Sequence, residues 1–329
     1  MNTFGRIFRI SIFGESHGKG IGVIIDGVPP GIKLTENEFT ADLSRRRSGA
    51  PGTTTRTEPD LPSLMSGTYN GFTTGAPLTV FFENTNIKSS DYDKLLDTPR
   101  PGHADFTSSV KYKGFADPRG GGHFSGRITL GLVTAGVVAK KIIQPMSISS
   151  QILEIGGLSD LNKALENISG SGDSIGGIIQ CTAQNVPAGL GEPFFGGVEA
   201  TISQLVFSIP AIKGIEFGKG FEAARMRGSD HNDPIISTQG KTQSNHSGGI
   251  NGGITNGNNL IFRVAVKPTS SISLPQQTIN LKTGQIETLQ IEGRHDTCIA
   301  LRMPVIVEAA TAIGLADLWL LNQKPEISL

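Results

Sequence analysis

The sequence predicts an α+β fold that is built from two similar halves. Short apolar runs at 7–13, 21–26 and 78–82 are bounded by glycine or proline, and they have the length and residue types of β-strands. Two longer stretches of small and apolar residues, about 125–143 and 304–322, have the length of buried helices. A chain of 329 residues that mixes such helices and strands is long enough to bury a substantial core.

The first predicted helix follows the second strand and a VPPG turn. Thr35 and Glu38 have the spacing of a capping box at its start. Phe39 and Leu43 are four residues apart and face the core. The helix ends in three successive arginines at 45–47, and neighbouring side chains on a helix point about 100° apart. The three guanidinium groups therefore cannot share one direction, and we expect at least one to be free for a ligand.

The two halves of the chain share a pattern of turns. The motif VPPG at 28–31 precedes a helix and then the spacing Gly-x-Thr-x-Gly-x-x-Leu at 71–78. The same order recurs with VPAG at 186–189 and the same spacing at 253–260. This recurrence indicates a weak internal duplication whose halves join near 146–175, where Ser, Gly and Asn concentrate. Chance recurrence of Gly-Thr turns before strands would explain the same pattern.

Charge and composition exclude several classes of protein. Basic and acidic residues balance at 29 each, so the sequence lacks the electrostatic signature of a general nucleic-acid or membrane binder. The uncharged run from Ile128 to Ala139 has 12 residues, too few for a spanning helix, which needs about 20. The N-terminus carries Arg6 and Arg9 and no export signal. We expect a cytoplasmic protein that binds neither nucleic acid nor membrane.

The sequence contains no clear metal-binding or nucleotide-binding motif. Cys181 and Cys298 lie within or next to apolar sequence, which predicts buried, reduced thiols and no metal site. No phosphate-binding P-loop pattern occurs. Residues 218–223 match the dinucleotide fingerprint only in its alanine form and without a clear βαβ unit, so we interpret them as a turn.

Histidines and arginines provide the strongest indication of chemistry. Five of the six histidines fall in polar, glycine- or arginine-marked segments: His17, His103, His123, His246 and His295. Imidazole titrates near neutrality, so histidines on such loops favour proton transfer. Arginine forks suit carboxylates and phosphates, and most of the following lie beside Gly or Pro: Arg45, Arg46, Arg47, Arg56, Arg100, Arg119, Arg127 and Arg294. Together they predict an enzyme with a multiply anionic substrate. For the run at 45–47 the alternative is a solvated helix end that complements the helix dipole.

Two loops are candidate phosphate sites. The run GGGHFSGR at 120–127 precedes a predicted helix, so its backbone N–H groups and the helix N-terminus can face an anion. The run KPTSS at 267–271 follows a predicted strand and offers one ammonium and three hydroxyl groups. An ordinary turn at the end of a strand explains this second run equally well.

A serine hydrolase is the alternative enzyme class. Gly14, Ser16 and Gly18 match the nucleophile elbow G-x-S-x-G, with His295 and Asp296 available later in the chain. However, the elbow needs a helix after the serine, and an apparent strand follows instead. A non-catalytic flavin or RNA-binding protein is a third class, but three tyrosines and one tryptophan offer little for base stacking.

Eleven ordered segments together resemble the chorismate synthase family nearly end to end. They are GESHG (14–18), DLSRRRSG (42–49), RPGHAD (100–105), RGGGHFSGR (119–127), GDSIGG (172–177), VPAGLGEP (186–193), KGIEFGKGF (213–221), QSNHSGG (243–249), GGITNG (252–257), KPTSSI (267–272) and GRHD (293–296). The resemblance implies an anti-1,4 elimination of phosphate from 5-enolpyruvylshikimate-3-phosphate. The product would be chorismate, at the end of the shikimate pathway, and the enzyme would need reduced FMN without net redox change.

The resemblance also implies residue roles. His17 would protonate the leaving phosphate, His103 would sit by the flavin N1, and Asp296 with Ser16 would help the flavin N5 region accept the substrate proton. The implied substrate clamps are Arg46, Arg47, Arg56, Arg100 and Arg127. The implied flavin contacts are Phe124, Ser125, Gly126, Pro210, Ala211, Gly252, Lys267, Pro268, Thr269, Ser270, Ser271 and Arg294, the last of which would also bind the substrate.

The family implies an architecture as well. We expect one domain over residues 1–329, a β-α-β sandwich with a helical layer between two antiparallel sheets, assembled as a homotetramer. Some relatives reduce their own flavin with NADPH, and this chain offers no convincing fingerprint for that, so we expect it to depend on externally reduced FMN. Ala50-Pro-Gly52 stands where many members carry an extra arginine, and His123 stands where some have arginine.

Overall fold

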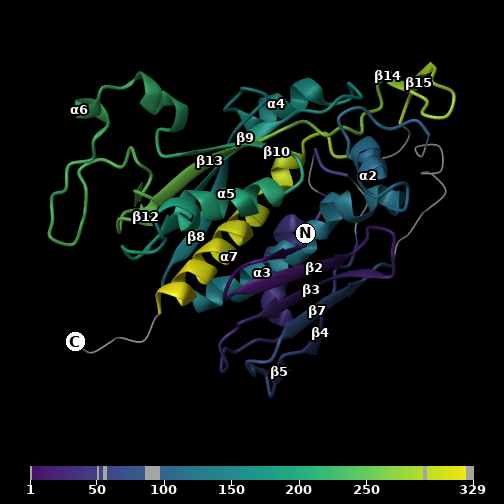
Figure 1. The fold of residues 1–329 in the computed structure, drawn as a ribbon. Coiled ribbons are helices and arrows are strands. Elements are labelled where there is room, and N and C mark those ends of the chain that lie inside the picture. Colours follow the sequence, from purple (N-terminus) through teal and green to yellow (C-terminus); the bar gives the residue numbers. More distant parts are fainter. Residues whose placement is uncertain (1, 50–51, 55–57, 86–96, 292–294, 324–329) are drawn as a thin grey trace.

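The computed structural model describes residues 2–49, 52–54, 58–85, 97–291 and 295–323, and it has the predicted α+β fold (Figure 1). In the first part of the chain the elements are β1 (Thr3–Phe4), β2 (Arg9–Gly14), β3 (Gly20–Asp26), η1 (Glu36–Phe39), α1 (Thr40–Arg46), β4 (Ser63–Ser66), β5 (Thr68–Tyr69), β6 (Phe72–Thr73), β7 (Leu78–Glu83), α2 (Asp105–Lys111), η3 (Arg119–Phe124), η4 (Gly126–Ile128) and α3 (Thr129–Ile142).

The remaining elements are β8 (Ser147–Ile155), α4 (Leu161–Ile168), β9 (Gly177–Gln184), η5 (Phe194–Gly196), α5 (Val198–Ser208), β10 (Ile212–Phe217), η6 (Gly220–Arg225), α6 (Gly228–His231), β11 (Ile250–Asn251), β12 (Ile254–Thr255), β13 (Leu260–Val266), β14 (Gln276–Ile279), β15 (Ile286–Leu289), η7 (Ile299–Arg302) and α7 (Pro304–Asn322). The segment 146–175, where we expected the halves to join, thus contains strand β8 and helix α4.

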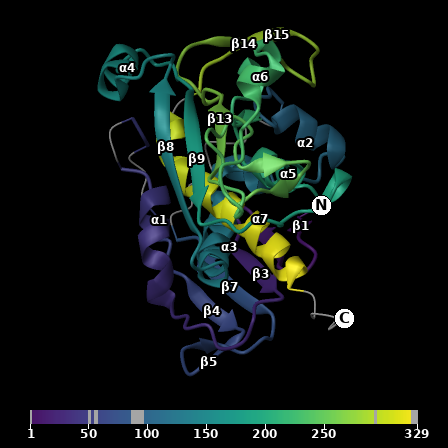
Figure 2. The same ribbon diagram turned by 90° about the vertical axis from the view of Figure 1, so that its left-hand side faces the viewer.

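Two antiparallel sheets form the frame of the fold. One has the strand order β1-β2-β3-β7-β4 and the other β10-β13-β9-β8. Helix α3 packs on β2 and β3, helix α7 packs on β8 and β9, and the two helices pack on each other. Both ribbon views show α3 and α7 running between the two sheets (Figures 1 and 2).

Small residues allow α3 and α7 to approach closely. A Cβ at Gly136 in α3 would lie 2.4 Å from the Cβ of Ala309 in α7, so only glycine fits there. Helix α7 is long and apolar enough by length and composition to cross a membrane, but 78% of that stretch is buried inside the protein. We therefore interpret α7 as a buried helix of the protein core and not as a membrane span.

A buried carboxylate connects the two ends of the described chain. Asp317 in α7 is 1% exposed, and its Oδ1 accepts hydrogen bonds from the backbone N–H groups of Arg6, Ile7 and Phe8 at 2.9, 2.7 and 3.0 Å. Three donors on one oxygen hold the segment that leads into β2 against the last helix.

Most predicted elements are confirmed, and one detail is wrong. The expected strands correspond to β2, β3 and β7, and α7 has the predicted bounds. Phe39 and Leu43 are buried as expected. The capping box is absent, because the helix opens with a 3-10 turn in which Thr35 makes no side-chain capping bond. Glu38 pairs with Lys141 of α3 instead, with Oε2 and Nζ 2.6 Å apart.

Both cysteines are free and buried, as predicted. Burial raises the pKa of the Cys181 thiol to about 11 and also raises the pKa of the Cys298 thiol. These thiols are structural groups rather than nucleophiles at neutral pH.

Candidate active site

The loop at 120–122 lies between two predicted proton-transfer histidines. All three glycines have positive φ angles, of 61°, 79° and 52°. A Cβ at Gly120 would lie 2.6 Å from Cδ2 of His17, and a Cβ at Gly121 would lie 3.5 Å from Nε2 of His103. The structure therefore brings His17 and His103 to the same short loop, although 86 positions separate them in the sequence (103 − 17).

The turn that carries Ser16 and His17 joins β2 to β3 and is held from both sides. The two side chains are 5% and 2% exposed, respectively. The Ser16 amide donates to the carbonyl of Gly122 at 3.1 Å. The Asn84 side chain donates to the carbonyls of Glu15 and Gly18 at 3.0 and 2.9 Å. This turn is thus fixed in place before any ligand binds.

The same turn does not support the serine hydrolase hypothesis. Strand β3 begins at Gly20, directly after the turn, whereas a nucleophile elbow continues into a helix. The proposed acid, Asp296, accepts hydrogen bonds from the Thr54 amide at 2.8 Å and from Nη1 of Arg302 at 3.0 Å.

His103 belongs to a tight group with Asp105 and Arg100. Its Nδ1 lies 2.6 Å from Oδ1 of Asp105. The Arg100 guanidinium donates to both Asp105 oxygens, at 2.7 Å from Nε and 2.8 Å from Nη2. Burial alone would raise the pKa of Asp105, but the hydrogen bonds from Arg100 and His103 hold it well below its usual range.

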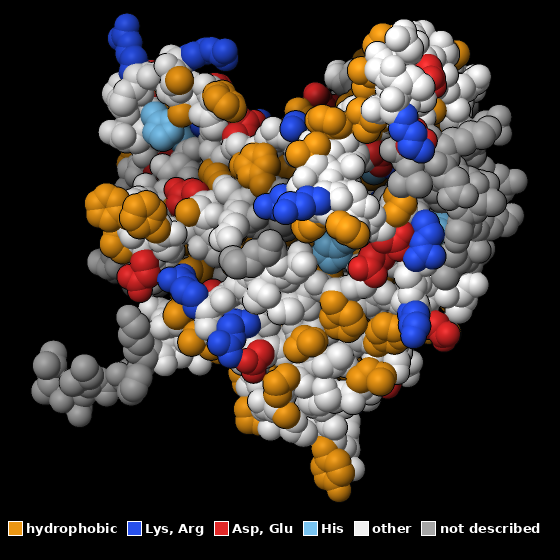
Figure 3. Space-filling view, turned by 45° about the vertical axis from the view of Figure 1, so that its right-hand side comes forward, with side chains coloured by type: hydrophobic (Ala, Val, Ile, Leu, Met, Phe, Trp, Pro, Cys, Tyr) orange, Lys and Arg blue, Asp and Glu red, His pale blue; other side chains and the backbone are white. Residues whose placement is uncertain are grey.

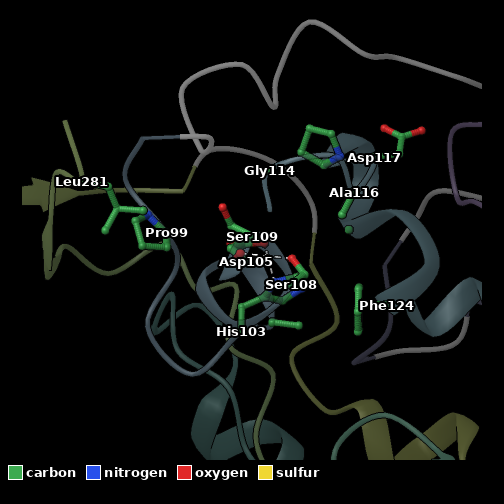
Figure 4. Close-up of a pocket in the computed structure, with 13 residues that line it drawn as sticks. Pro99, His103, Asp105, Ser108, Ser109, Gly114, Ala116, Asp117, Phe124 and Leu281 are labelled. Carbon is green, nitrogen blue, oxygen red and sulfur yellow. Dashed lines mark hydrogen bonds and ion pairs between the residues drawn. The ribbon is translucent and has the colours of Figure 1, made fainter. Parts of the chain in front are cut away.

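Figure 4 shows His103 and Asp105 on the wall of a small cavity of about 50 Å³, with Phe124 on one side and Pro99 on the other. Arg100 is only 7% exposed, and its Nη1 also donates to the Ser271 hydroxyl at 3.1 Å. We predicted Arg100 as a substrate clamp from the sequence. In the structure its guanidinium holds Asp105 and Ser271.

The predicted flavin residues after β13 lie against the His103 loop. Nζ of Lys267 donates to the Ser270 hydroxyl at 2.7 Å and to the Gly102 carbonyl at 3.2 Å. The Lys267 amide donates to the carbonyl of Ala211 at 2.9 Å. Burial, together with the nearby Lys213, lowers the pKa of Lys267. Residues predicted separately as flavin contacts therefore meet next to His103.

Other predicted flavin residues occupy different places. Ser125 and Pro210 line a second cavity of about 270 Å³ together with His123, and Ser125 caps the turn into α3 by accepting from the Arg127 amide. Gly252 lies in the turn between β11 and β12, and Figure 1 shows β12 on the opposite side of the molecule from α2, the helix that begins two residues after His103. The single chain does not bring Gly252 to this site.

The guanidinium groups of the arginines at 45–47 do not all share one direction, as predicted, and each has a partner within the protein. Arg45 donates to both oxygens of Glu308 at 2.7 Å. Arg46 donates to Asp60 at 2.7 Å, and Arg47 donates to the Pro59 carbonyl. The expectation of a free guanidinium is therefore wrong, because acidic and carbonyl oxygens from other segments meet each one.

Asp60 is the centre of a buried charged group. It accepts from Arg46 and also from Nη1 of Arg127 at 2.8 Å. Burial lowers the pKa of Arg46 to about 10, against the opposing attraction of Asp60. Nε of Arg127 donates to Asn84 at 2.9 Å, which connects this group to the His17 turn. Two further predicted site residues, Arg56 and Arg294, lie outside the described residues, as does Ala50.

Sequence reasoning missed Asp60, Asn84 and Asp105. Only Asp105 had a local signal, because it lies two residues after His103 at the start of a polar helix. Asp60 and Asn84 occur in segments with no recognisable motif, and their roles depend on contacts that the fold creates.

A pair of buried or half-buried histidines around a glycine loop, beside several arginines, is typical of an enzyme that transfers protons next to an anionic group. A family model described as chorismate synthase matches residues 8–320. The chorismate synthase of Chitinophaga pinensis is 58% identical over 325 residues, with 98% of each chain covered. That of Pyrococcus abyssi is 44% identical, with 98% of this chain and 99% of the other covered.

A solved structure titled "Crystal Structure of Chorismate Synthase" superposes with a TM-score of 0.75 at 28% identity, covering 97% of this chain and 93% of the other. The chain belongs to the chorismate synthase family. It is a carbon–oxygen lyase that acts at the last step of the shikimate pathway.

Proposed function

We propose that this chain eliminates phosphate from 5-enolpyruvylshikimate-3-phosphate in an anti-1,4 sense to give chorismate, with reduced FMN as its cofactor. The observation that carries the proposal is the placement of His17 and His103 on either side of the loop at 120–122. A proton donor, a second imidazole and a loop of backbone N–H groups are what departure of a phosphate requires.

The residues divide the chemistry between them. His17 donates a proton to the leaving phosphate oxygen, next to the glycine loop at 120–122. His103 would help to hold the cofactor, and Asp296 with Ser16 would assist removal of the substrate proton beside it. Asp296 is ion-paired with Arg302, with Oδ2 and Nη1 3.0 Å apart. When bound, reduced flavin would supply electron density to the substrate while the C–O bond to phosphate and the C–H bond break, and it would be regenerated at the end of the reaction.

The described residues fit a flavin with a phosphate tail. The ammonium of Lys267 and the hydroxyl of Ser270 lie next to the His103 loop. Oγ1 of Thr269 is buried and has no hydrogen-bond partner within the described chain, so it offers a donor to a ligand. Phe124 lines the His103 cavity and provides an apolar wall for a ring system.

Phosphate release under anaerobic conditions tests this proposal. Release with photoreduced FMN alone supports an enzyme that needs externally reduced flavin, as we expect. Release also with oxidised FMN and NADPH would show an intrinsic flavin reductase. His17→Ala and His103→Ala should lower kcat by about 10²–10⁴-fold in folded protein. His231→Ala, which removes the histidine of helix α6, is the matched control. No release under either condition would refute the proposed reaction.

We also propose that the fold is a duplicated β-α-β sandwich in one domain. Thr73 and Thr255 occupy equivalent places in the two halves. The amides of Gly31 and Gly189 donate to their respective carbonyls, both at 2.8 Å. Each threonine hydroxyl donates to the carbonyl two residues before that glycine, at 2.7 and 2.6 Å. Matching bonds in both halves support a duplication over a chance recurrence, and the layers α3 and α7 between two sheets support the sandwich.

We propose that the protein forms a homotetramer in the cytoplasm. Phe194, Phe195 and Phe221 are 90%, 98% and 80% exposed, which is unusual for phenylalanine and supports burial by further copies. Figure 3 shows several hydrophobic side chains standing out from one face of the molecule. Gly252 would reach a flavin site only from another copy. Light scattering after size-exclusion chromatography measures the assembly, and a monomeric mass would refute it.

A further inference from the structure

We infer that Asp105 is a positioning residue that fixes the tautomer and orientation of His103, and that Arg100 holds Asp105 for this role. The inference deepens the proposed function, on which it rests for the importance of His103. Its basis is the three-residue group in RPGHAD: His103 Nδ1 is 2.6 Å from Asp105, and Arg100 donates twice to the same carboxylate.

The short distance decides where the imidazole proton lies. A carboxylate is only an acceptor, and the paired Arg100 keeps Asp105 in that form. The 2.6 Å contact therefore requires the proton on Nδ1 of His103. Nη2 of Arg100 also lies 3.0 Å from Nδ1 of His103. A guanidinium only donates hydrogen bonds, and a protonated Nδ1 cannot accept one, so this contact is not a hydrogen bond.

The other ring nitrogen of His103, Nε2, then faces the glycine loop beside the cavity. With Nδ1 protonated, Nε2 of the neutral ring carries the lone pair. A Cβ at Gly121 would be 3.5 Å from Nε2, so this edge of the ring faces the glycine loop. Figure 4 shows the ring on the wall of the cavity that Phe124 also lines. Asp105 thus determines which atom His103 presents to a bound ligand.

Arg100 leaves Asp105 little freedom to rotate. Its backbone amide donates to Oδ2 of Asp105 at 3.1 Å, in addition to the two guanidinium bonds. Nη1 donates to Ser271, so the side chain is anchored at its far end as well. Prolines flank Arg100 on both sides and restrict its backbone. A guanidinium group that is held in this way has less capacity to clamp a substrate.

The test is Asp105→Asn, because an amide can both accept from and donate to Nδ1 and so leaves the tautomer undetermined. In ¹⁵N-histidine NMR spectra of the wild-type protein, we expect Nδ1 of neutral His103 to be protonated and Nε2 to be unprotonated. The variant should show a mixture of both tautomers. Its kcat should fall by about 10²-fold while KM for the substrate stays within about twofold.

Asp26→Asn is the matched control, since it also removes a carboxylate paired with an arginine, at the end of β3 that is remote from the His17 turn. It should change neither the His103 spectrum nor kcat. Protonated Nε2 in the wild-type protein would overturn the inference even if Asp105→Asn fails to fold. An unchanged tautomer or an unchanged kcat in folded Asp105→Asn would also overturn it. If the wild-type protein shows the expected tautomer but releases no phosphate, the proposed function fails and the positioning role stands.

Discussion

Gly120→Ala is the substitution that most directly tests the arrangement of the site. The new Cβ would lie 2.6 and 2.7 Å from Cδ2 and Nε2 of His17, and 2.9 Å from the hydroxyl of Ser16. These distances are far below van der Waals contact, so something must move. His17 is 2% exposed and packed against the loop, so we expect the imidazole and the loop to separate.

The substitution should have two separate effects, one on stability and one on the reaction rate. Gly120 has a φ angle of 61°, and an alanine in that left-handed region costs about 1–2 kcal/mol. Displacing His17 by the order of 1 Å from its reacting partner lowers the rate by about 10²-fold. We therefore expect a modest loss of unfolding free energy in urea and a large loss of kcat in the phosphate-release assay.

Gly157→Ala separates these two parts. Gly157 has a φ angle of 82°, and an added Cβ would meet nothing within 4 Å. This control should lose a similar amount of stability and keep the wild-type kcat per folded molecule. If Gly120→Ala also keeps the wild-type kcat, the loop at 120–122 does not position His17, and the reasoning for the site is refuted.

Three further predictions concern stability. Asp317→Ala leaves three N–H groups without their acceptor, that of Phe8 buried and those of Arg6 and Ile7 partly buried, and should lower the free energy of unfolding by about 3 kcal/mol, measured in urea; a loss below about 1 kcal/mol would contradict the anchoring role. Thr255→Val removes a hydroxyl that both donates and accepts, and it should cost about 1–3 kcal/mol; a much smaller loss in Thr73→Val would argue against equivalence of the halves. Burial would raise the pKa of Asp233, but hydrogen bonds from the amides of Ser247 and His246 lower it to about 2. The folded pKa lies below the unfolded value of about 3.9, so this carboxylate stabilises the fold above pH ~4 and that contribution is lost as the pH falls towards 2. The stability difference between wild-type protein and Asp233→Asn should therefore be present at pH 6 and vanish near pH 2, and a difference that persists there would contradict it.

The elements that local pattern determines were predictable from the sequence. The bounds of helix α7 were predicted correctly, because an apolar stretch of 19 residues that begins at Pro304 and ends at polar residues has the length and composition of a buried helix. Strands β2 and β3 were found for the same kind of reason, since glycine-bounded apolar runs favour them. The glycine run at 120–122 was recognised as a tight loop, but its contacts with His17 and His103 could not be inferred.

The pairing of charges was the least predictable part of the site. Arg46 and Arg127 meet Asp60, although 67 positions separate Arg127 from Asp60. The sequence shows that an arginine lies near glycine or proline, but only the folded chain decides whether a ligand or a buried carboxylate satisfies it. The capping box failed for a related reason, because a tertiary ion pair with Lys141 competes for Glu38.

The anchoring of residues 6–8 by Asp317 has a consequence for how the protein is made. The segment that leads to His17 leaves the ribosome long before its anchor on α7, because about 310 residues separate them. The turn that carries His17 can therefore be anchored only after α7 has been synthesised. A ribosome-bound nascent chain that lacks α7 leaves the apolar surfaces of α3, β8 and β9 on which α7 packs uncovered, and exposed apolar surface of this kind favours aggregation until α7 has been made.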